Sequence, residues 1–170
     1  MKRAILLLFA LFMIVPSKAK VEEKNKGYRG YVDLALGGAY NLNTAQTIST
    51  NNMQLYTLIS TTHGYVINNW FVGAGIGYYH SYRDNENIFP FYAAGRYTFE
   101  NVKLQPFIEA RTGIMFDPLW IQQVQAYGAL SIGMTIYKGL QIDLRGSIFS
   151  RPSRFFTANA AVVIGYTFGK

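Results

Sequence analysis

The sequence contains no cysteine, so its fold cannot depend on disulfide bonds. Charged side chains are also scarce, at 15% of the 170 residues, where about 25% is usual for a soluble domain. Only two histidines, His63 and His80, are present. Without thiolate ligands to support them, no metal site is expected. These absences exclude the small disulfide-stapled class of secreted domains and leave a chain too poor in charge for an ordinary water-exposed surface.

The first 19 residues have the composition of a cleaved export signal. They comprise a basic start (Lys2, Arg3), an apolar run (5–15) and a small-residue cleavage site (17–19). Eleven apolar residues are too few to cross a bilayer, which takes about 20. Cleavage of 19 residues from 170 leaves 151, enough for one domain, and lowers the net charge from +7 to +4 because Lys2, Arg3 and Lys18 are removed. So small a positive charge does not indicate a nucleic-acid partner.

Apolar and polar residues alternate with period two after the signal, which predicts β-strands. The alternation is clearest from Leu140 to Ile148, where every even position is aliphatic or Gly146 and the odd positions include Asp143 and Arg145. Aromatic residues make up 16% of the chain. The predicted strands are 28–40, 53–66, 70–82, 89–99, 104–114, 124–136, 140–148 and 158–168. The second of them alternates least well, and we place Leu55, Ile59 and Tyr65 on its apolar face.

The connections between these strands alternate between long and short, as expected for an up-and-down antiparallel barrel with turns at one rim and loops at the other. The prediction is therefore an all-β, eight-stranded barrel over residues 28–168, preceded by a polar lead-in at 20–27. The final strand ends in Phe168 and would be an exposed edge in water, so we expect it to close on the first strand.

Seven charged residues on the strands share one parity, opposite to the aliphatic face: Arg29, Asp33, Arg96, Glu109, Arg111, Asp143 and Arg145. A soluble, ligand-binding barrel would turn this face to water, but seven charges among many Gly, Ala and Ser residues are sparse for a solvated wall. We therefore predict a transmembrane barrel with the charged face inside, lining a closed polar lumen. Its outward face ends in aromatic residues, as expected at membrane interfaces: Tyr28, Tyr40, Tyr65, Trp70, Tyr78, Phe89, Phe99, Phe116, Tyr166 and Phe168.

The charged residues inside such a barrel are expected to form ion pairs, because a buried charge needs a partner. Arg111 with Glu109 and Asp143 with Arg145 are the predicted pairs. An eight-stranded barrel is just wide enough for its own side chains, so no diffusion pore is expected. A gate within a narrow porin-like channel is the alternative.

Catalytic signatures are weak. The glycines of Gly73-x-Gly75-x-Gly77 lack the spacing and the following helix of a dinucleotide-binding loop, so no cofactor is expected. Ser60, Ser81, Ser131 and Ser147 could act as nucleophiles only beside an oriented histidine. No serine–histidine spacing in the chain marks such a group, so an enzyme is not predicted.

The last long loop carries Arg151 and Arg154 beside Phe155 and Phe156. Arginines can bind lipopolysaccharide phosphates while aromatic rings enter the headgroup layer. The alternative is a solvated loop that is merely basic.

Several stretches carry a resemblance to a known family: Gly27-Tyr28-Arg29-Gly30-Tyr31-Val32-Asp33-Leu34, Ser60-Thr61-Thr62-His63-Gly64-Tyr65, Phe71-Val72-Gly73-Ala74-Gly75-Ile76-Gly77 and Ile164-Gly165-Tyr166-Thr167-Phe168. With the signal they resemble small outer-membrane β-barrel proteins of the Bacteroidetes type, broadly similar to OmpA/OmpX-like barrels. The resemblance implies an outer-membrane location in a Gram-negative cell envelope. It also implies insertion by the barrel-assembly machinery through the C-terminal strand.

We expect a monomer in contact with membrane lipid and lipopolysaccharide, with a structural or surface-interaction role. A lipid-modifying enzyme of the lipid A deacylase or acyltransferase type is the alternative.

Overall fold

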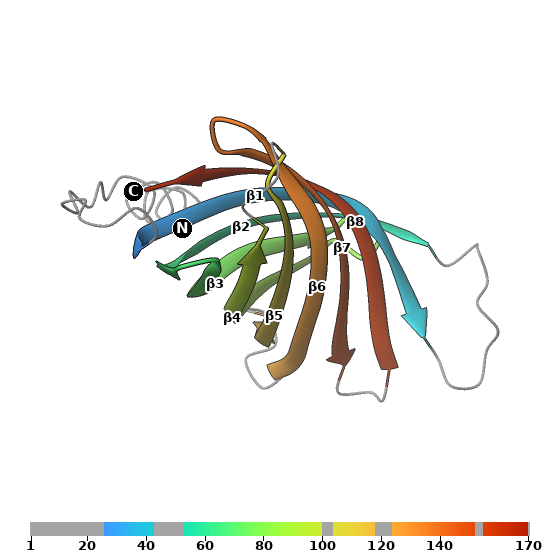
Figure 1. Ribbon diagram of the computed structural model, residues 1–170. Coiled ribbons are helices and arrows are strands. Elements are labelled where there is room, and N and C mark those ends of the chain that lie inside the picture. The colour runs from blue at the N-terminus through green and yellow to red at the C-terminus, as the bar shows by residue number, and fades with distance from the viewer. Residues whose placement is uncertain (1–25, 43–52, 100–103, 118–123, 152–154, 170) are drawn as a thin grey trace, which may run out of the picture.

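The structure is a computed structural model that describes residues 26–42, 53–99, 104–117, 124–151 and 155–169. It contains eight strands in chain order (Figure 1): β1 (Lys26–Leu42), β2 (Gln54–Ile67), β3 (Trp70–Ser81), β4 (Glu86–Thr98), β5 (Pro106–Phe116), β6 (Val124–Tyr137), β7 (Leu140–Arg151) and β8 (Phe155–Phe168). No helix among these residues is long and apolar enough to cross a membrane. The predicted signal at 1–19 and most of the lead-in lie outside the described residues.

Each strand pairs antiparallel with its neighbours in sequence, and β1 pairs with β8 to close the barrel. Leu34 of β1 lies opposite both Ile59 of β2 and Ile164 of β8. The predicted fold class, an eight-stranded up-and-down barrel, is therefore confirmed. Because β8 pairs with β1, its apolar residues do not form an exposed sheet edge, as expected from the sequence.

The predicted alternation of long and short connections is wrong in detail. The β3–β4 connection is only 82–85, and the β7–β8 connection is 152–154, although both were expected to be long. The β4–β5 connection, expected to be short, spans 99–105. The reason is that β4 begins at Glu86 and β8 at Phe155, so polar and aromatic residues assigned to loops extend the ladders instead.

A two-residue turn joins β6 to β7 through Lys138 and Gly139, whose φ angles of 42° and 90° are both positive. Positive φ at both central residues is the geometry of a type I′ turn, whose twist matches that of the flanking strands. A register shift between Thr135 and Tyr137 precedes the turn. As a result, Ile136 and Tyr137 are both exposed, 46% and 64%, although they are adjacent in sequence.

Apart from this irregularity before the turn, side chains alternate between the inside and the outside of the barrel. Along β7, Gln141, Asp143 and Arg145 are buried whereas Leu144 is 62% exposed. The other strands follow the phase predicted from the sequence, including β2, where Leu55, Ile59 and Tyr65 are exposed. The outward face is thus mainly apolar on every strand, with a few polar residues such as Thr57, His63 and His80 among the apolar ones.

The interior is only partly polar, which corrects the expectation of a polar lumen. A cluster of buried apolar and aromatic side chains shares it with the charged groups. Tyr56 and Tyr79 stack at 4.9 Å, and Phe149 meets Tyr79 edge-on at 5.8 Å. These inward rings occupy the part of the lumen toward the β1–β2 and β3–β4 connections, which we call the loop rim. The opposite end, where β1 begins and β8 ends, is the terminal rim.

Candidate functional site

Six of the seven predicted lumen charges lie together inside the barrel and are at most 3% exposed: Asp33, Arg96, Glu109, Arg111, Asp143 and Arg145. Each comes from an inward-facing position of β1, β4, β5 or β7. Together with Gln141 we call these six residues the lumen plug. Arg29, the seventh, is only half-buried and lies nearer the terminal rim.

Asp33 of β1 is the acceptor at the centre of the plug. Its Oδ2 atom lies 2.5 Å from Arg111 Nη2, which comes from β5, and 3.1 Å from Arg145 Nη2, which comes from β7. Its Oδ1 atom accepts a 3.1 Å hydrogen bond from Gln141 Nε2. Because β1 and β5 stand on opposite sides of an eight-stranded ring, the Asp33–Arg111 pair crosses the lumen.

Glu109 bridges two arginines on either side of it. Its Oε1 atom accepts from Arg111 Nε at 2.5 Å, which is the pair predicted from the sequence. Its Oε2 atom accepts from Arg96 Nε at 2.6 Å. Two guanidinium groups and two carboxylates are therefore chained across three strands, and such pairing is what a buried charge requires.

The guanidinium of Arg96 is held between two aromatic rings. Its Cζ atom is 3.9 Å from the Tyr31 ring centroid and 4.0 Å from that of Phe107. Tyr31 belongs to β1 and Phe107 to β5, so this stack also spans the barrel. Arg96 additionally donates to Gln141 Oε1 at 2.7 Å.

Neutral hydroxyl groups extend the plug to further strands. Arg111 Nη1 donates to Ser60 Oγ at 3.2 Å and to the Tyr92 hydroxyl at 3.0 Å. The Tyr92 hydroxyl is also 2.9 Å from Thr62 Oγ1, and Arg145 Nε donates to Ser131 Oγ at 3.0 Å. Strands β1, β2, β4, β5, β6 and β7 are thereby connected through the lumen.

Asp143 is less well held than the other acids. Its predicted partner, Arg145, lies 3.6 Å away, a longer separation than the other ion pairs of the plug. Neither carboxylate oxygen accepts a hydrogen bond from the described protein atoms. Arg145 instead directs its guanidinium toward Asp33 and Ser131. The sequence pattern placed Asp143 and Arg145 on one face, but could not show that Asp33 competes for the same arginine.

The ten predicted interface aromatics all lie on outward positions and divide between the two rims. Those at the terminal rim are Tyr28, Tyr65, Trp70, Phe99, Tyr166 and Phe168, and those at the loop rim are Tyr40, Tyr78, Phe89 and Phe116. Tyr82 and Tyr137, 58% and 64% exposed, add to the two groups. Sequence reasoning left Tyr137 out because the register shift before the turn changes its face.

Both histidines lie on outward positions at opposite rims. His63 lies at the terminal rim. Its Nε2 atom is 2.9 Å from Thr61 Oγ1, and its Nδ1 atom is hydrogen-bonded to the Tyr28 hydroxyl. His80, at the loop rim, donates from Nδ1 to Asn87 Oδ1 at 3.0 Å, because a carbonyl oxygen can only accept. A neutral His80 ring therefore keeps Nε2 unprotonated.

The serines considered as nucleophiles lie on the other side of the barrel wall. Ser60, Ser81, Ser131 and Ser147 all point inward and are at most 8% exposed. The hydroxyl that lies across the ladder from His80 belongs to Thr57, and it is hydrogen-bonded to the Tyr82 hydroxyl at 2.8 Å. Within the described ranges, no group of three or more acidic or histidine side chains could hold a metal ion.

The predicted lipopolysaccharide-contacting loop is placed only in part. Phe156 is 52% exposed on the outward face of β8, opposite Leu42. Arg154 and the side chains of Arg151 and Phe155 lie outside the described residues.

Comparisons with known proteins agree on the fold. No protein-family model and no curated protein sequence matches the chain. Among solved structures, it is similar to the outer-membrane enzyme PagL (TM-score 0.62, 13% identity, 80% of this chain and 98% of PagL). It is also similar to neisserial surface protein A (TM-score 0.54, 12% identity, 83% of this chain and 97% of that protein). A third similar structure is that of Ail, the attachment invasion locus protein of Yersinia pestis (TM-score 0.51, 9% identity, 84% of this chain and 99% of Ail). The chain therefore has the fold of small outer-membrane β-barrels.

Proposed function

We propose that this protein is an integral outer-membrane barrel, a small OmpA/OmpX-like protein of the Bacteroidetes type with a structural or surface-interaction role. The observation that carries the proposal is the inversion of the barrel: charged side chains are paired in its interior, while large apolar side chains are exposed outside. Leu130, Ile132 and Leu144 are 62–70% exposed on adjacent strands. Water does not tolerate so continuous an apolar surface, whereas hydrocarbon requires it.

The two groups of outward aromatics support the same orientation. Tyrosine and tryptophan gather where an apolar phase meets water, and here they form one group at each rim. Strands of 11 to 17 residues are long enough for a tilted crossing, which needs about 9 to 11. We place the termini on the periplasmic side, the loop rim outside, and Phe156 in reach of lipopolysaccharide. Insertion is assigned to the barrel-assembly machinery acting on β8.

The lumen plug favours a closed barrel over a narrow porin-like channel. Side chains from opposite strands meet in its centre, and Arg96 is fixed between two rings, so no continuous water path is expected at that level. The plug stabilises the barrel, and the exposed loops are left to interact with partners. We propose that the protein acts as a monomer.

A lipid-modifying enzyme is the second candidate, and the oriented His80–Asn87 pair is the observation that favours it. The pair lies on the outward face at the loop rim, where outer-leaflet lipid headgroups would lie. The proposal of a non-catalytic barrel is supported by the inward position of Ser60, Ser81, Ser131 and Ser147, because the barrel wall separates these hydroxyls from His80. Loss of lipopolysaccharide deacylation in His80→Ala, with activity retained in His63→Ala, would establish the enzyme instead.

Outer-membrane fractionation together with a heat-shift gel tests the main proposal. A folded barrel should be found in the outer-membrane fraction and migrate faster before boiling than after it. Recovery of the protein in the periplasm or the medium without detergent would refute the membrane assignment.

A further inference from the structure

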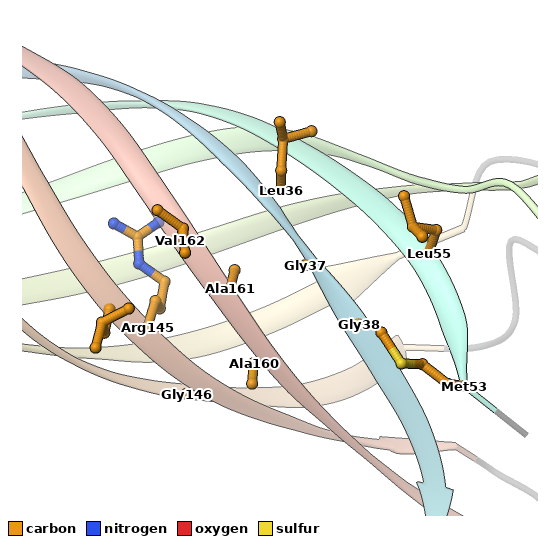
Figure 2. A pocket seen from close by; sticks show the side chains of 11 residues that line it. Leu36, Gly37, Gly38, Met53, Leu55, Arg145, Gly146, Ala160, Ala161 and Val162 are labelled. Atoms are coloured by element: carbon orange, nitrogen blue, oxygen red, sulfur yellow. The ribbon is translucent and has the colours of Figure 1, made fainter. Parts of the chain in front are cut away.

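The outward face carries a groove that spans four consecutive strands of the closed sheet, β2, β1, β8 and β7 (Figure 2). The space over the groove amounts to about 630 Å³ and is open on the outer side of the barrel. Its walls include Leu36, Leu55, Leu144 and Val162, each of them at least half exposed. Small outward residues such as Gly95 and Gly128 also occur elsewhere on the barrel, but here three of them adjoin on neighbouring strands, so the apolar belt is locally depressed.

The register of the sheet produces this depression. Gly38, Ala160 and Gly146 lie side by side on β1, β8 and β7, and all three face outward. The next outward row toward the terminal rim places Leu36, Val162 and Leu144 on the same three strands. A floor with almost no side-chain atoms therefore adjoins a wall of branched aliphatic residues.

The loop-rim end of the groove is bounded by Met53. Its side chain reaches over Gly38, where an added Cβ would overlap the Met53 methyl group. The Tyr40 hydroxyl donates to Met53 Sδ at 3.1 Å and holds the thioether in place. At Gly146, in contrast, an added Cβ would meet no atom within 4 Å. The space above Gly146 is therefore open to a ligand.

The groove offers no charge to its occupant. Arg145 contributes to the lining, but its guanidinium is turned inward, where it bonds Asp33 and Ser131. The remaining lining residues are aliphatic, methionine or glycine. A headgroup, sugar or peptide would leave its polar groups without partners here, whereas a hydrocarbon chain would not.

We propose that the groove binds one acyl chain of a membrane lipid, seated on Ala160 and Gly146 beside the Met53 side chain that covers Gly38, and held against the Leu36–Leu144 wall. The inference rests on the proposed function, because it requires the outward face to lie in lipid. It goes further in naming a fixed lipid site on one side of the barrel. Such a chain replaces the missing side-chain atoms and restores the packing that the small residues leave incomplete.

A second copy of this protein fits the groove less well. Small residues do allow close approach of membrane segments, but a symmetric contact requires each surface to fill the hollow of the other. Eleven residues line the groove, whereas a stable protein interface takes about 20–30 residues on each side.

Native mass spectrometry of the detergent-solubilised protein with added dimyristoylphosphatidylcholine tests the site. Gly146→Leu fills the floor, and Gly95→Leu is the matched control, because Gly95 also faces outward with no atom within 4 Å of an added Cβ but does not line the groove. Ala160→Leu provides an independent filling on β8. We expect bound lipid to fall about tenfold in both filled variants, since contact with a few methylenes is lost, and to be unchanged in Gly95→Leu.

Equal lipid binding by wild type, Gly146→Leu and Gly95→Leu would overturn the proposal. A wild-type dimer that dissociates in Gly146→Leu would also overturn it, in favour of a second copy as the occupant. A heat-shift gel establishes that each variant is folded. A wild-type protein that fractionates with the outer membrane yet binds no lipid refutes the groove alone, whereas a protein absent from that fraction refutes the proposed function.

Discussion

Asp33 and Arg111 come from opposite strands of the barrel, β1 and β5, and their side chains meet in the lumen at 2.5 Å. The contact joins residues 78 positions apart in sequence. Both side chains are almost completely buried, 0% and 1% exposed. Because Asp33 also binds Arg145 and Gln141, and Arg111 also binds Glu109, this single pair links the two halves of the lumen plug. Its removal should affect the whole barrel rather than one hairpin.

Replacing Arg111 with leucine should lower the free energy of unfolding by about 3–5 kcal/mol, because Asp33 and Glu109 then remain buried with one partner fewer. Denaturant titration of the refolded barrel, followed by tryptophan fluorescence, measures the change. Arg83→Leu, at an exposed turn position, serves as the control and should change stability by less than about 0.5 kcal/mol. An unchanged midpoint in Arg111→Leu would show that the plug does not stabilise the barrel.

The wild-type protein should conduct no ions in a planar bilayer, because side chains from opposite strands meet at the level of the plug. Simultaneous replacement of Arg96 and Arg111 by alanine removes two of the three guanidinium groups of the plug, so small conductance steps are expected. Single-channel recording distinguishes the two cases. Steady conductance by the wild type would instead favour the porin-like alternative.

The seam between β1 and β8 should depend on Gly30. An added Cβ at this position would overlap the ring of Phe168, its cross-strand partner. Gly30→Val must therefore displace Phe168 from its contact with His63, 5.7 Å away between ring centroids. We expect a lower yield of the heat-shifted folded form on refolding.

Gly95→Val is the matched control for the seam, since its added side chain meets no atom within 4 Å of Cβ. Both variants exchange an outward glycine for a residue with good strand propensity. Equal yields for the two would show that the position of Phe168 is not important for closure.

Single cysteines on β7 can be used to test which face meets lipid, and the chain has no native cysteine to interfere. In proteoliposomes, Leu144→Cys should react slowly with a charged maleimide, because its outward position lies in hydrocarbon. A cysteine at exposed Asn85, in the β3–β4 connection, should react rapidly. Rapid labelling of Leu144→Cys in the bilayer would place the apolar face in water and contradict the membrane assignment.

The strand plan could be predicted from sequence because alternation with period two is a local property. The inward and outward residues of β7, from Leu140 to Ile148, follow directly from it, and even the weakly alternating β2 was assigned the correct face. Strand ends were predicted less well: Glu86 and Phe155 lie inside strands because cross-strand pairing, absent from the local pattern, continues through polar residues. Tyr137 was missed because a register shift reverses its face.

The candidate sites show the same division. The sequence by itself determined that Asp33, Glu109, Arg111 and Arg145 share one face of a closed barrel, because parity along each strand is fixed by the backbone. Only the tertiary structure decided that Arg145 lies closer to Asp33 than to its predicted partner Asp143 (3.1 against 3.6 Å). The same holds for Gly38, Ala160 and Gly146, which adjoin as the floor of one groove. These relationships depend on the stagger between strands and on closure of β8 onto β1, which bring together residues far apart in sequence.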